Sequence, residues 1–345
     1  MSGGYLYDRK LVEYLESQGD QVTIFSLPQG QYGMQVLQNF TASLSGALAD
    51  TGFDVLLQDE LNHPSLFWLN RRVRTRINYP VVSIVHHLRL SEPMAGSLFG
   101  VKPFLERCYL NSVDAYIYNS ETTRQVVEGL VGVIKPCIVA YPAGNRLAGT
   151  PTRAQIQKRS HAQGSLRVLF LGNVIPRKGL HTLMDALDQL PPESWQLHVA
   201  GSLDMDPSYA RSMLQKAKSM KRKIQIHFEG SLQDSDLSEL LLRCHVLAIP
   251  SSYEGFGIAY LEGMSFGLPA IGGAAGGAVE IITPGRDGFL IKKDDVDSLA
   301  SHLHTLAHDR DLLEKMSHAA RRRFLGHPGW DQSMEHIRAF LLELI

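Results

Sequence analysis

Short apolar runs alternate with longer amphipathic stretches along this chain, in two series separated by a polar segment. The first series predicts strands at Val22–Leu27, Val55–Gln58, Val81–Val85, Ala115–Asn119 and Cys137–Tyr141. The second predicts strands at Leu166–Leu171, Gln196–Ala200, Ile224–Phe228, His245–Pro250, Pro269–Ile271 and Gly288–Ile291. The stretches between them predict helices at Leu6–Gln18, Gln35–Asp50, Pro103–Ser112, Glu121–Gly129, Leu180–Leu190, Pro207–Met220, Asp234–Arg243, Gly257–Phe266, Gly277–Ile282 and Val296–Arg323. This alternation predicts an α/β protein with two doubly wound, Rossmann-like parallel-sheet domains.

The polar segment between the two series sets the expected domain boundaries. Residues 149–165 are rich in Arg, Lys, Gln and Ser, and they predict a linker. A domain over residues 1–148 precedes the linker, and a second domain over residues 166–329 follows it. Two such halves predict a ligand site in the cleft between them.

The start of the chain departs from this pattern. Gly3-Gly4 directly precedes a helical stretch, and such a glycine pair normally closes the loop between a strand and a helix. We therefore expect that the first strand is missing from this sequence and that the protein begins upstream of Met1. The alternative is a protein that simply begins with a helix.

Composition narrows the class of protein. The chain has 345 residues, enough for two domains, and its formal net charge of −1 gives no support to nucleic-acid binding. Its three scattered cysteines predict buried thiols in a reducing compartment. No apolar run approaches the roughly 20 residues of a membrane span, and we find no signal-peptide pattern. We expect a soluble, cytoplasmic protein.

The segment from Pro250 to Pro269 carries the most chemistry. An apolar strand enters a Ser- and Gly-rich turn that an amphipathic helix follows, which is the layout of a ligand-binding loop at the carboxyl end of a parallel strand. Glu254 lies in the loop and Glu262 in the helix. The backbone N–H groups at the helix start favour phosphate, and the carboxylates suit hydroxyls. A sugar nucleotide has both groups.

Two further loops contain glycines. Residues 172–179 place Arg177 and Lys178 just before a helix, which predicts either a diphosphate clamp or a solvated loop with two surface cations. Residues 272–277 contain four glycines but do not match the dinucleotide-binding fingerprint. They predict either a phosphate or sugar loop or a structural turn.

Together these segments carry a family resemblance. Glu254-Gly-Phe-Gly with Glu262, followed by Gly267-Leu-Pro-Ala and Gly276-Gly-Ala-Val-Glu, resembles the signature of glycosyltransferase family 4, the group 1 glycosyl transferases. Its members are retaining, nucleotide-sugar-dependent enzymes of GT-B fold. Residues 172–187 are similar to the family's diphosphate-binding segment, although Asn173 stands where the family has Arg. Whether Arg177 replaces that cation stays open. The resemblance covers almost the whole chain.

The resemblance implies roles in the second domain. Glu254 would contact the hydroxyls of the donor sugar, and Glu262 would contact the ribose. Arg177 and Lys178, with helix N-termini, would stabilise the departing diphosphate, so we expect neither a metal ligand set nor a cofactor besides the nucleotide-sugar co-substrate. The other expected donor-binding residues of this domain are Gly172, Asn173, Gly255, Phe256, Gly257 and Ile258.

The first domain offers weaker candidates. Gly3 and Gly4 resemble the family's opening unit and would lie at the donor. His86 and His87 follow a strand, and one of them would position the sugar or assist the acceptor. The last helix, residues 330–345, would cross back and complete the first domain, as is common in GT-B enzymes.

These observations predict a metal-independent retaining glycosyltransferase of hexosyltransferase type, with its acceptor (a glycan, a lipid or a small molecule) unidentified. The alternatives are a nucleotide-sugar epimerase of the same architecture and a catalytically degenerate sugar-nucleotide-binding protein. A basic and aromatic stretch is either an ordinary surface helix, which we favour, or a weak contact with an anionic membrane. Its residues are Phe67, Trp68, Arg71, Arg72, Arg74 and Arg76.

Overall fold

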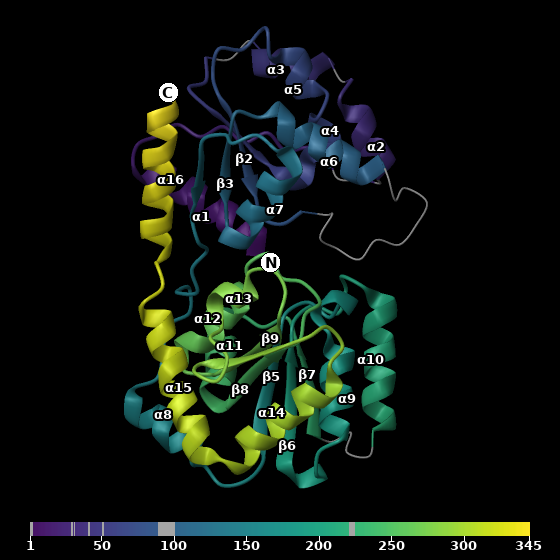
Figure 1. The fold of residues 1–345 in the computed structure, drawn as a ribbon, viewed down its shortest axis with the longest axis vertical. Helices are drawn as coiled ribbons and strands as arrows, with labels where there is room; N and C mark the ends of the chain where they lie inside the picture. Colours follow the sequence, from purple (N-terminus) through teal and green to yellow (C-terminus); the bar gives the residue numbers. More distant parts are fainter. Residues whose placement is uncertain are drawn as a thin grey trace. The chain divides into compact units, whose positions relative to one another are not determined.

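The computed structural model describes residues 3–28, 30, 32–40, 42–49, 52–88, 101–220 and 225–345. It divides into two compact units, Met1–Pro142 with Trp330–Ile345, and Ala143–Gly329. Among these residues, each unit has one sheet, and its strands all pair in parallel. The expected parallel α/β architecture is confirmed (Figure 1). None of the helices in the described ranges is long and apolar enough to cross a membrane.

The sheet of unit 1 has four strands in sequential order. They are β1 (Leu56–Asp59), β2 (Val81–Val85), β3 (Ala115–Tyr118) and β4 (Cys137–Val139). The helices of the unit are α1 (Gly3–Ser17), α2 (Tyr32–Gln38), α3 (Ala42–Ala49), α4 (His63–Leu66), α5 (Leu69–Val73), α6 (Val101–Ser112), α7 (Glu121–Val131) and α16 (Trp330–Leu344). Side chains from β2, β3, α5 and α6 form its core, among them the fully buried Leu69, Val85 and Tyr109.

Helix α16 lies beside α1 in unit 1, although the two are at opposite ends of the sequence (Figure 1). The rings of Tyr7 and Trp330 meet edge to face with centroids 5.9 Å apart. Arg338 donates to both carboxylate oxygens of Asp20, at 2.7 and 3.0 Å. The last helix therefore belongs to unit 1.

Two predicted elements of unit 1 differ in the structure. Residues 22–27 form no strand, and no strand in the described part of the chain pairs with them. A strand without a neighbour leaves its N–H and C=O groups to water, so this mostly exposed stretch stays irregular. The predicted helix Gln35–Asp50 is two helices, α2 and α3, separated by a turn at residues 39–40; Asp50 lies outside the described residues.

Unit 2 contains a six-stranded sheet in the order β10-β9-β8-β5-β6-β7. The strands are β5 (Leu166–Leu171), β6 (Trp195–Ala200), β7 (Ile226–Gly230), β8 (Val246–Ile249), β9 (Ala270–Gly273) and β10 (Gly288–Ile291). The helices are α8 (Arg153–Ser160), α9 (Leu180–Asp188), α10 (Pro207–Ser219), α11 (Asp234–Arg243), α12 (Ile258–Ser265), α13 (Ala278–Ile281), α14 (Val296–His308) and α15 (Arg310–Leu325). Ile224, at the start of one predicted strand, lies outside the described residues.

The strand order of unit 2 reverses between β5 and β8. The chain builds β5, β6 and β7 outward in one direction and then returns to place β8 on the other side of β5. In such sheets, ligands bind beyond the carboxyl ends of the strands at the reversal. The loops after β5 and β8 are two of the three loops that the sequence analysis singled out.

The predicted linker over residues 149–165 is wrong in its central part. Residues 153–160 form α8, which packs against α15 within unit 2. Ile156 and Arg159 are buried there, and the Arg159 guanidinium donates to the carbonyl oxygens of Leu241 and Gly267. The Arg159 side chain thus holds α8 in place by hydrogen bonds to backbone carbonyl groups. A count of apolar residues does not detect this kind of contact.

Candidate functional site

The loop after β5 turns sharply toward α9. Residues 176–178 form a short 3-10 turn, and Gly179 follows with φ of 73°. A Cβ atom at Gly179 would lie 2.3 Å from the carbonyl oxygen of Pro250, at the start of the loop after β8. Only glycine permits this approach. It brings Arg177 and Lys178 against the second loop.

Both cations converge on Glu254. The Nζ atom of Lys178 lies 2.6 Å from Oε1 of Glu254, and Ser251 donates to the same oxygen at 2.5 Å. Arg177 lies 3.6 Å from Oε2 and donates to the carbonyl oxygen of Tyr253 at 2.5 Å. The Glu254 residue is 6% exposed. Side chains from the loops after β5 and β8 therefore form one polar cluster, in which Ser251 and Glu254 are buried and the two cations are partly exposed.

The cations keep Glu254 ionised. Burial alone would raise the pKa of Glu254, but Lys178 and Arg177, together with the hydrogen bonds, lower that pKa by more. The pKa of the Glu254 carboxyl group therefore lies below its usual value despite the burial of this residue. Two cations face one anion here, so the cluster retains a positive excess that suits an additional anionic ligand.

The glycine loop after β9 supports Glu254 from a third side. The backbone N–H of Gly277 donates to the carbonyl oxygen of Glu254 at 2.8 Å, and Gly276 pairs with Glu254 as an isolated bridge. Gly276 has φ of 69°, and a Cβ atom there would lie 1.8 Å from that carbonyl oxygen. The sequence predicts that residues 272–277 form either a phosphate or sugar loop or a structural turn. This geometry favours the structural turn, because these residues hold the backbone of the neighbouring loop after β8.

The other predicted donor-binding residues of unit 2 lie around this cluster. Gly172 lies beside Lys178, since its Cβ would be 3.5 Å from Cε of that lysine. Asn173 follows it in the same loop. Gly257 has φ of 108° and precedes Ile258, the first residue of α12. Phe256 is buried, and its ring packs against His327 at 5.7 Å.

Glu262 is held by an arginine that the sequence analysis did not select. The Nε atom of Arg146 lies 2.5 Å from Oε1 of Glu262, and the same guanidinium forms an ion pair with Asp234 at the start of α11. Burial raises the pKa of Glu262, Arg146 lowers it and Asp234 raises it, so that the pKa lies above its usual value. The pair is separated by 116 positions in sequence, and no local pattern signals it.

In unit 1 the structure brings Gly4 and His86 together. Gly3 and Gly4 form the first turn of α1, and a Cβ at Gly4 would lie 3.1 Å from Cδ2 of His86. Nε2 of His86 lies 2.8 Å from a carboxylate oxygen of Asp8, a partner that the sequence analysis missed. His87 is half-buried beside it.

One group within the described ranges has the spacing of metal ligands. Atoms of Glu60, His63 and Glu106 lie within 4.8 Å of one another, and all three residues are buried. His63 forms an ion pair with Glu60 at 3.0 Å, and Tyr32 lies 3.1 Å from its Nε2. No local pattern in the sequence marks this group, because its members lie in three elements: a 3-10 turn (Glu60–Asn62), α4 and α6.

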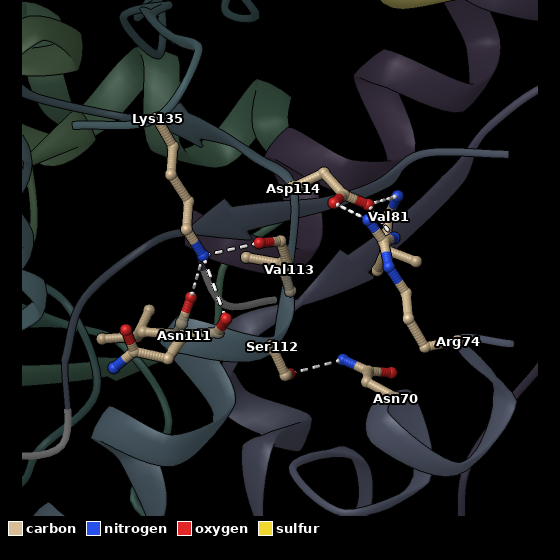
Figure 2. A network of polar contacts seen from close by, with 9 residues as sticks. Asn70, Arg74, Val81, Asn111, Ser112, Val113, Asp114 and Lys135 are labelled. Carbon is tan, nitrogen blue, oxygen red and sulfur yellow. Dashed lines mark hydrogen bonds and ion pairs between the residues drawn. The ribbon is translucent and has the colours of Figure 1, made fainter. Parts of the chain in front are cut away.

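Arginines of the basic stretch near Trp68 contact other residues of unit 1. Arg74 binds both carboxylate oxygens of Asp114, which also accepts from the N–H of Val81 at 2.9 Å (Figure 2). Arg72 donates to the carbonyl oxygen of Asn39 at 3.1 Å, and Arg76 lies 3.5 Å from the Ser45 hydroxyl. These contacts are those of a surface helix, and contact with a membrane stays a prediction.

Figure 2 shows a second cation in the same region that serves packing. Nζ of Lys135 donates to the carbonyl oxygens of Leu110, Asn111 and Val113, at 3.1, 3.1 and 2.6 Å. These groups lie at the end of α6, where backbone carbonyls lack helical partners. The polar network fixes α6 against the sheet.

The sequence of this chain matches a known protein family. The model of the family "Glycosyl transferases group 1" matches residues 151–323. The sulfoquinovosyl transferase SQD2 of Arabidopsis thaliana is 32% identical over 157 residues, which are 45% of this chain and 29% of SQD2. A glycogen synthase of Mycobacterium tuberculosis is 25% identical over 73% of this chain and 60% of its own length. The chain thus spans less than two thirds of these curated relatives.

Solved structures cover more of the chain. The sucrose-phosphate synthase of Thermosynechococcus elongatus superposes with a TM-score of 0.82 at 19% identity, covering 100% of this chain and 94% of its own. Anabaena HepE in complex with UDP-glucose superposes with a TM-score of 0.74 at 21% identity, covering 96% and 89%. These similarities confirm the expected GT-B fold of two Rossmann-like domains.

Proposed function

The chain belongs to the group 1 glycosyl transferases, and from that premise we propose that it transfers a sugar from a nucleoside-diphosphate sugar to an acceptor hydroxyl, with retention of configuration and without a metal ion. In this reaction the bond between the anomeric carbon and the diphosphate oxygen breaks. The acceptor oxygen forms the new bond to that carbon and gives up its proton. The nucleoside diphosphate leaves with the extra negative charge.

The observation that carries this proposal is the cluster of Arg177, Lys178 and Glu254 at the strand reversal of unit 2. Negative charge grows on the departing diphosphate, and fixed cations stabilise that charge without rearranging during the reaction. The two cations are already held beside the loop by a buried acid and by the Tyr253 carbonyl. We propose that Arg177 substitutes for the cation that Asn173 does not provide.

The two acids have different proposed partners. Glu254 is ionised, and its carboxylate would accept hydrogen bonds from sugar hydroxyls close to the cations. Glu262, one helix turn or more into α12, would accept from the ribose hydroxyls. The backbone N–H groups at the start of α12 would receive phosphate oxygens, because a helix N-terminus favours anions.

The similar proteins support a nucleotide sugar but differ in its base and in the acceptor. HepE was solved with UDP-glucose. A Corynebacterium glutamicum relative, 29% identical over 178 residues, is named a GDP-mannose-dependent phosphatidylinositol monomannoside mannosyltransferase. We therefore propose a hexose donor without a chosen base, and an acceptor bound by unit 1, with one of His86 and His87 as a candidate contact.

Donor turnover tests the proposal. UDP-, GDP- and ADP-hexoses are incubated with the protein in EDTA, with water alone or with added glycan and lipid acceptors. Release of nucleoside diphosphate and transfer of the sugar to the acceptor are measured. Lys178→Ala should lower kcat/KM by about 100- to 1,000-fold, the size of effect seen when one charge-stabilising group is lost. Lys158→Ala, on the exposed side of α8, is the matched control and should retain wild-type turnover.

The same assay separates the rival reactions. Transfer with retention gives a product with the donor's anomeric configuration, read by proton NMR. An epimerase would instead convert the sugar without any acceptor, and a degenerate binding protein would bind donor without turnover. A Lys178→Ala variant as active as Lys158→Ala would refute the proposed role of the cations.

A further inference from the structure

Arg146 links the short segment after Pro142 to two helices of unit 2. Its Nε contacts Oε1 of Glu262 in α12, and its terminal nitrogen contacts Asp234 at the first position of α11. The Glu262 residue is 5% exposed, whereas the Asp234 side chain is 63% exposed. The guanidinium thus has one buried and one solvated acid partner.

Arg146 contacts one of the two carboxylate oxygens of Glu262. Oε1 accepts from Arg146, whereas Oε2 accepts no hydrogen bond from any residue in the described ranges. A carboxylate has about four acceptor positions on two oxygens. Glu262 therefore retains acceptor capacity on the oxygen that Arg146 does not contact.

We propose that Arg146 is a positioning residue: it fixes one oxygen of Glu262 so that the other can accept hydrogen bonds from the ribose hydroxyls of a bound nucleotide. This inference rests on the proposed function, because it takes Glu262 as the ribose ligand. Planar guanidinium groups suit this task, since their nitrogens hold carboxylates in a defined orientation.

Backbone packing keeps Arg146 in reach of Glu262. A Cβ atom at Gly144 would lie 2.6 Å from Cβ of Leu261 and 2.9 Å from the backbone nitrogen of Glu262. The segment from Gly144 to Arg146 is therefore pressed directly onto the first turns of α12. Its conformation, and not only the arginine side chain, determines where the guanidinium lies.

The charged groups around Glu262 come from several elements. Arg146 favours its ionised form and Asp234 opposes it. Among the other elements packed against α12, Arg321 of α15 donates to the carbonyl oxygen of Ser265, and Glu280 lies on α13. Among the cations that the structure describes, Arg146 is the one that contacts this carboxylate. Without it, burial should move protonation of Glu262 to higher pH.

Nucleotide affinity as a function of pH tests this role. The full chain is titrated by calorimetry with whichever of UDP, GDP and ADP binds wild type most tightly, from about pH 4 to about pH 8, a range that begins near the ordinary Glu pKa of about 4.3 and extends well above it. Arg146→Leu should weaken binding about tenfold near neutrality and more as the pH falls. The pH at which affinity is half lost should move upward.

Companion variants separate positioning from folding. Arg146→Lys should restore most of the wild-type pH profile because it keeps the charge. Arg153→Leu, at an exposed position of α8, should behave as wild type. Arg146→Gln replaces Arg146→Leu if the latter does not fold. The preference of wild type for the ribonucleotide over its 2′-deoxy form should shrink in Arg146→Leu.

The outcomes distinguish this inference from the function on which it rests. An Arg146→Leu protein with wild-type affinity, or with a uniform loss and an unshifted pH profile, overturns the positioning role while leaving nucleotide binding intact. Failure of wild type to bind any of the three nucleotides overturns the proposed function and this inference together.

Discussion

At the residue scale, the site depends on ionisable side chains held by partners distant in sequence. Lys178 and Glu254 are 76 positions apart, and Arg146 and Glu262 are 116 apart. The sequence identifies Lys178, Glu254 and Glu262 because each lies in a segment with a recognisable pattern. It does not identify Arg146 or Asp8, because a partner that arrives from another part of the fold leaves no local pattern.

The pair of His86 and Asp8 makes stability depend on pH. Burial lowers the pKa of His86, but the ion pair with Asp8 and two further carboxylates raise it by more, so the pKa lies above its usual value. Because the pKa of His86 is higher in the folded than in the unfolded protein, the protonated imidazole stabilises the folded state. This stabilisation is fully present below the unfolded pKa of about 6.5 and is lost as the pH rises through the folded pKa.

Asp8→Asn should therefore reduce the free energy of unfolding at acidic and neutral pH and have little effect well above the folded pKa of His86. Urea unfolding of wild type and variant at several pH values measures this. Asp331→Asn, a substitution of an exposed acid on α16, is the control and should leave the pH dependence unchanged. An Asp8→Asn curve parallel to that of wild type at all pH values would contradict the role of the pair.

At the element scale, glycines set how closely loops approach one another around the site. Gly179, Gly276 and Gly144 each lie where an added Cβ would overlap backbone atoms of another segment. The first two have positive φ, but Gly144 is required only by the space that Leu261 and Glu262 leave. The sequence marks Gly276 through its glycine-rich loop, whereas nothing local distinguishes Gly144.

Gly144→Ala should destabilise unit 2 by about 1–3 kcal/mol, the usual cost of overpacking, because the segment must move off α12. It should also weaken nucleotide binding, since Arg146 moves with that segment. Gly129→Ala is the matched control: Gly129 is exposed within α7, and a Cβ there meets no atom within 4 Å. It should stabilise α7 by up to about 1 kcal/mol.

Chemical unfolding and calorimetric titration of both variants decide the matter. If Gly144→Ala is as stable as wild type and binds nucleotide equally well, the close approach has no energetic importance.

The polar segment after Thr150 shows where composition misleads. Residues 149–165 have few apolar side chains, yet α8 forms there with a capping box in which Thr152 and Gln155 bond each other's backbone N–H groups. A Thr-x-x-Gln pattern is a recognised helix start, so this helix was detectable from its cap. Its docking was not, because it depends on Arg159 reaching the carbonyl groups of Leu241 and Gly267.

At the scale of the whole molecule, each unit has its own parallel sheet and core. Alternating apolar and amphipathic runs predicted most strands of both sheets within a few residues, because buried parallel strands are nearly continuous apolar runs. The strand order of unit 2, and thus the reversal between β5 and β8, came from the structure. The family resemblance supplied the GT-B fold, which hydrophobic patterning alone does not specify.

The return of α16 to unit 1 gives a prediction about unfolding. Ile337 is fully buried in α16, and Ile337→Ala should destabilise unit 1 by about 2–4 kcal/mol through the cavity that it creates. Leu342→Ala, on the same helix but 55% exposed, should change stability by less than about 0.5 kcal/mol.

Differential scanning calorimetry of the full chain should show that Ile337→Ala shifts the transition of unit 1 while nucleotide still stabilises unit 2. If Ile337→Ala abolishes the nucleotide-dependent stabilisation as well, the two units do not behave as separate folding units.

The central claim is that the cations of unit 2, Arg177 and Lys178, bind the diphosphate of a nucleotide sugar. The most direct measurement compares, by calorimetry in EDTA, the affinities of UDP, GDP and ADP with those of UMP, GMP and AMP. We predict that wild type prefers at least one diphosphate by about tenfold or more, since an additional charged phosphate gains charge-assisted hydrogen bonds, and that Arg177→Ala and Lys178→Ala each reduce this preference. Equal affinities for diphosphates and monophosphates, or a preference that survives both substitutions, would contradict the claim.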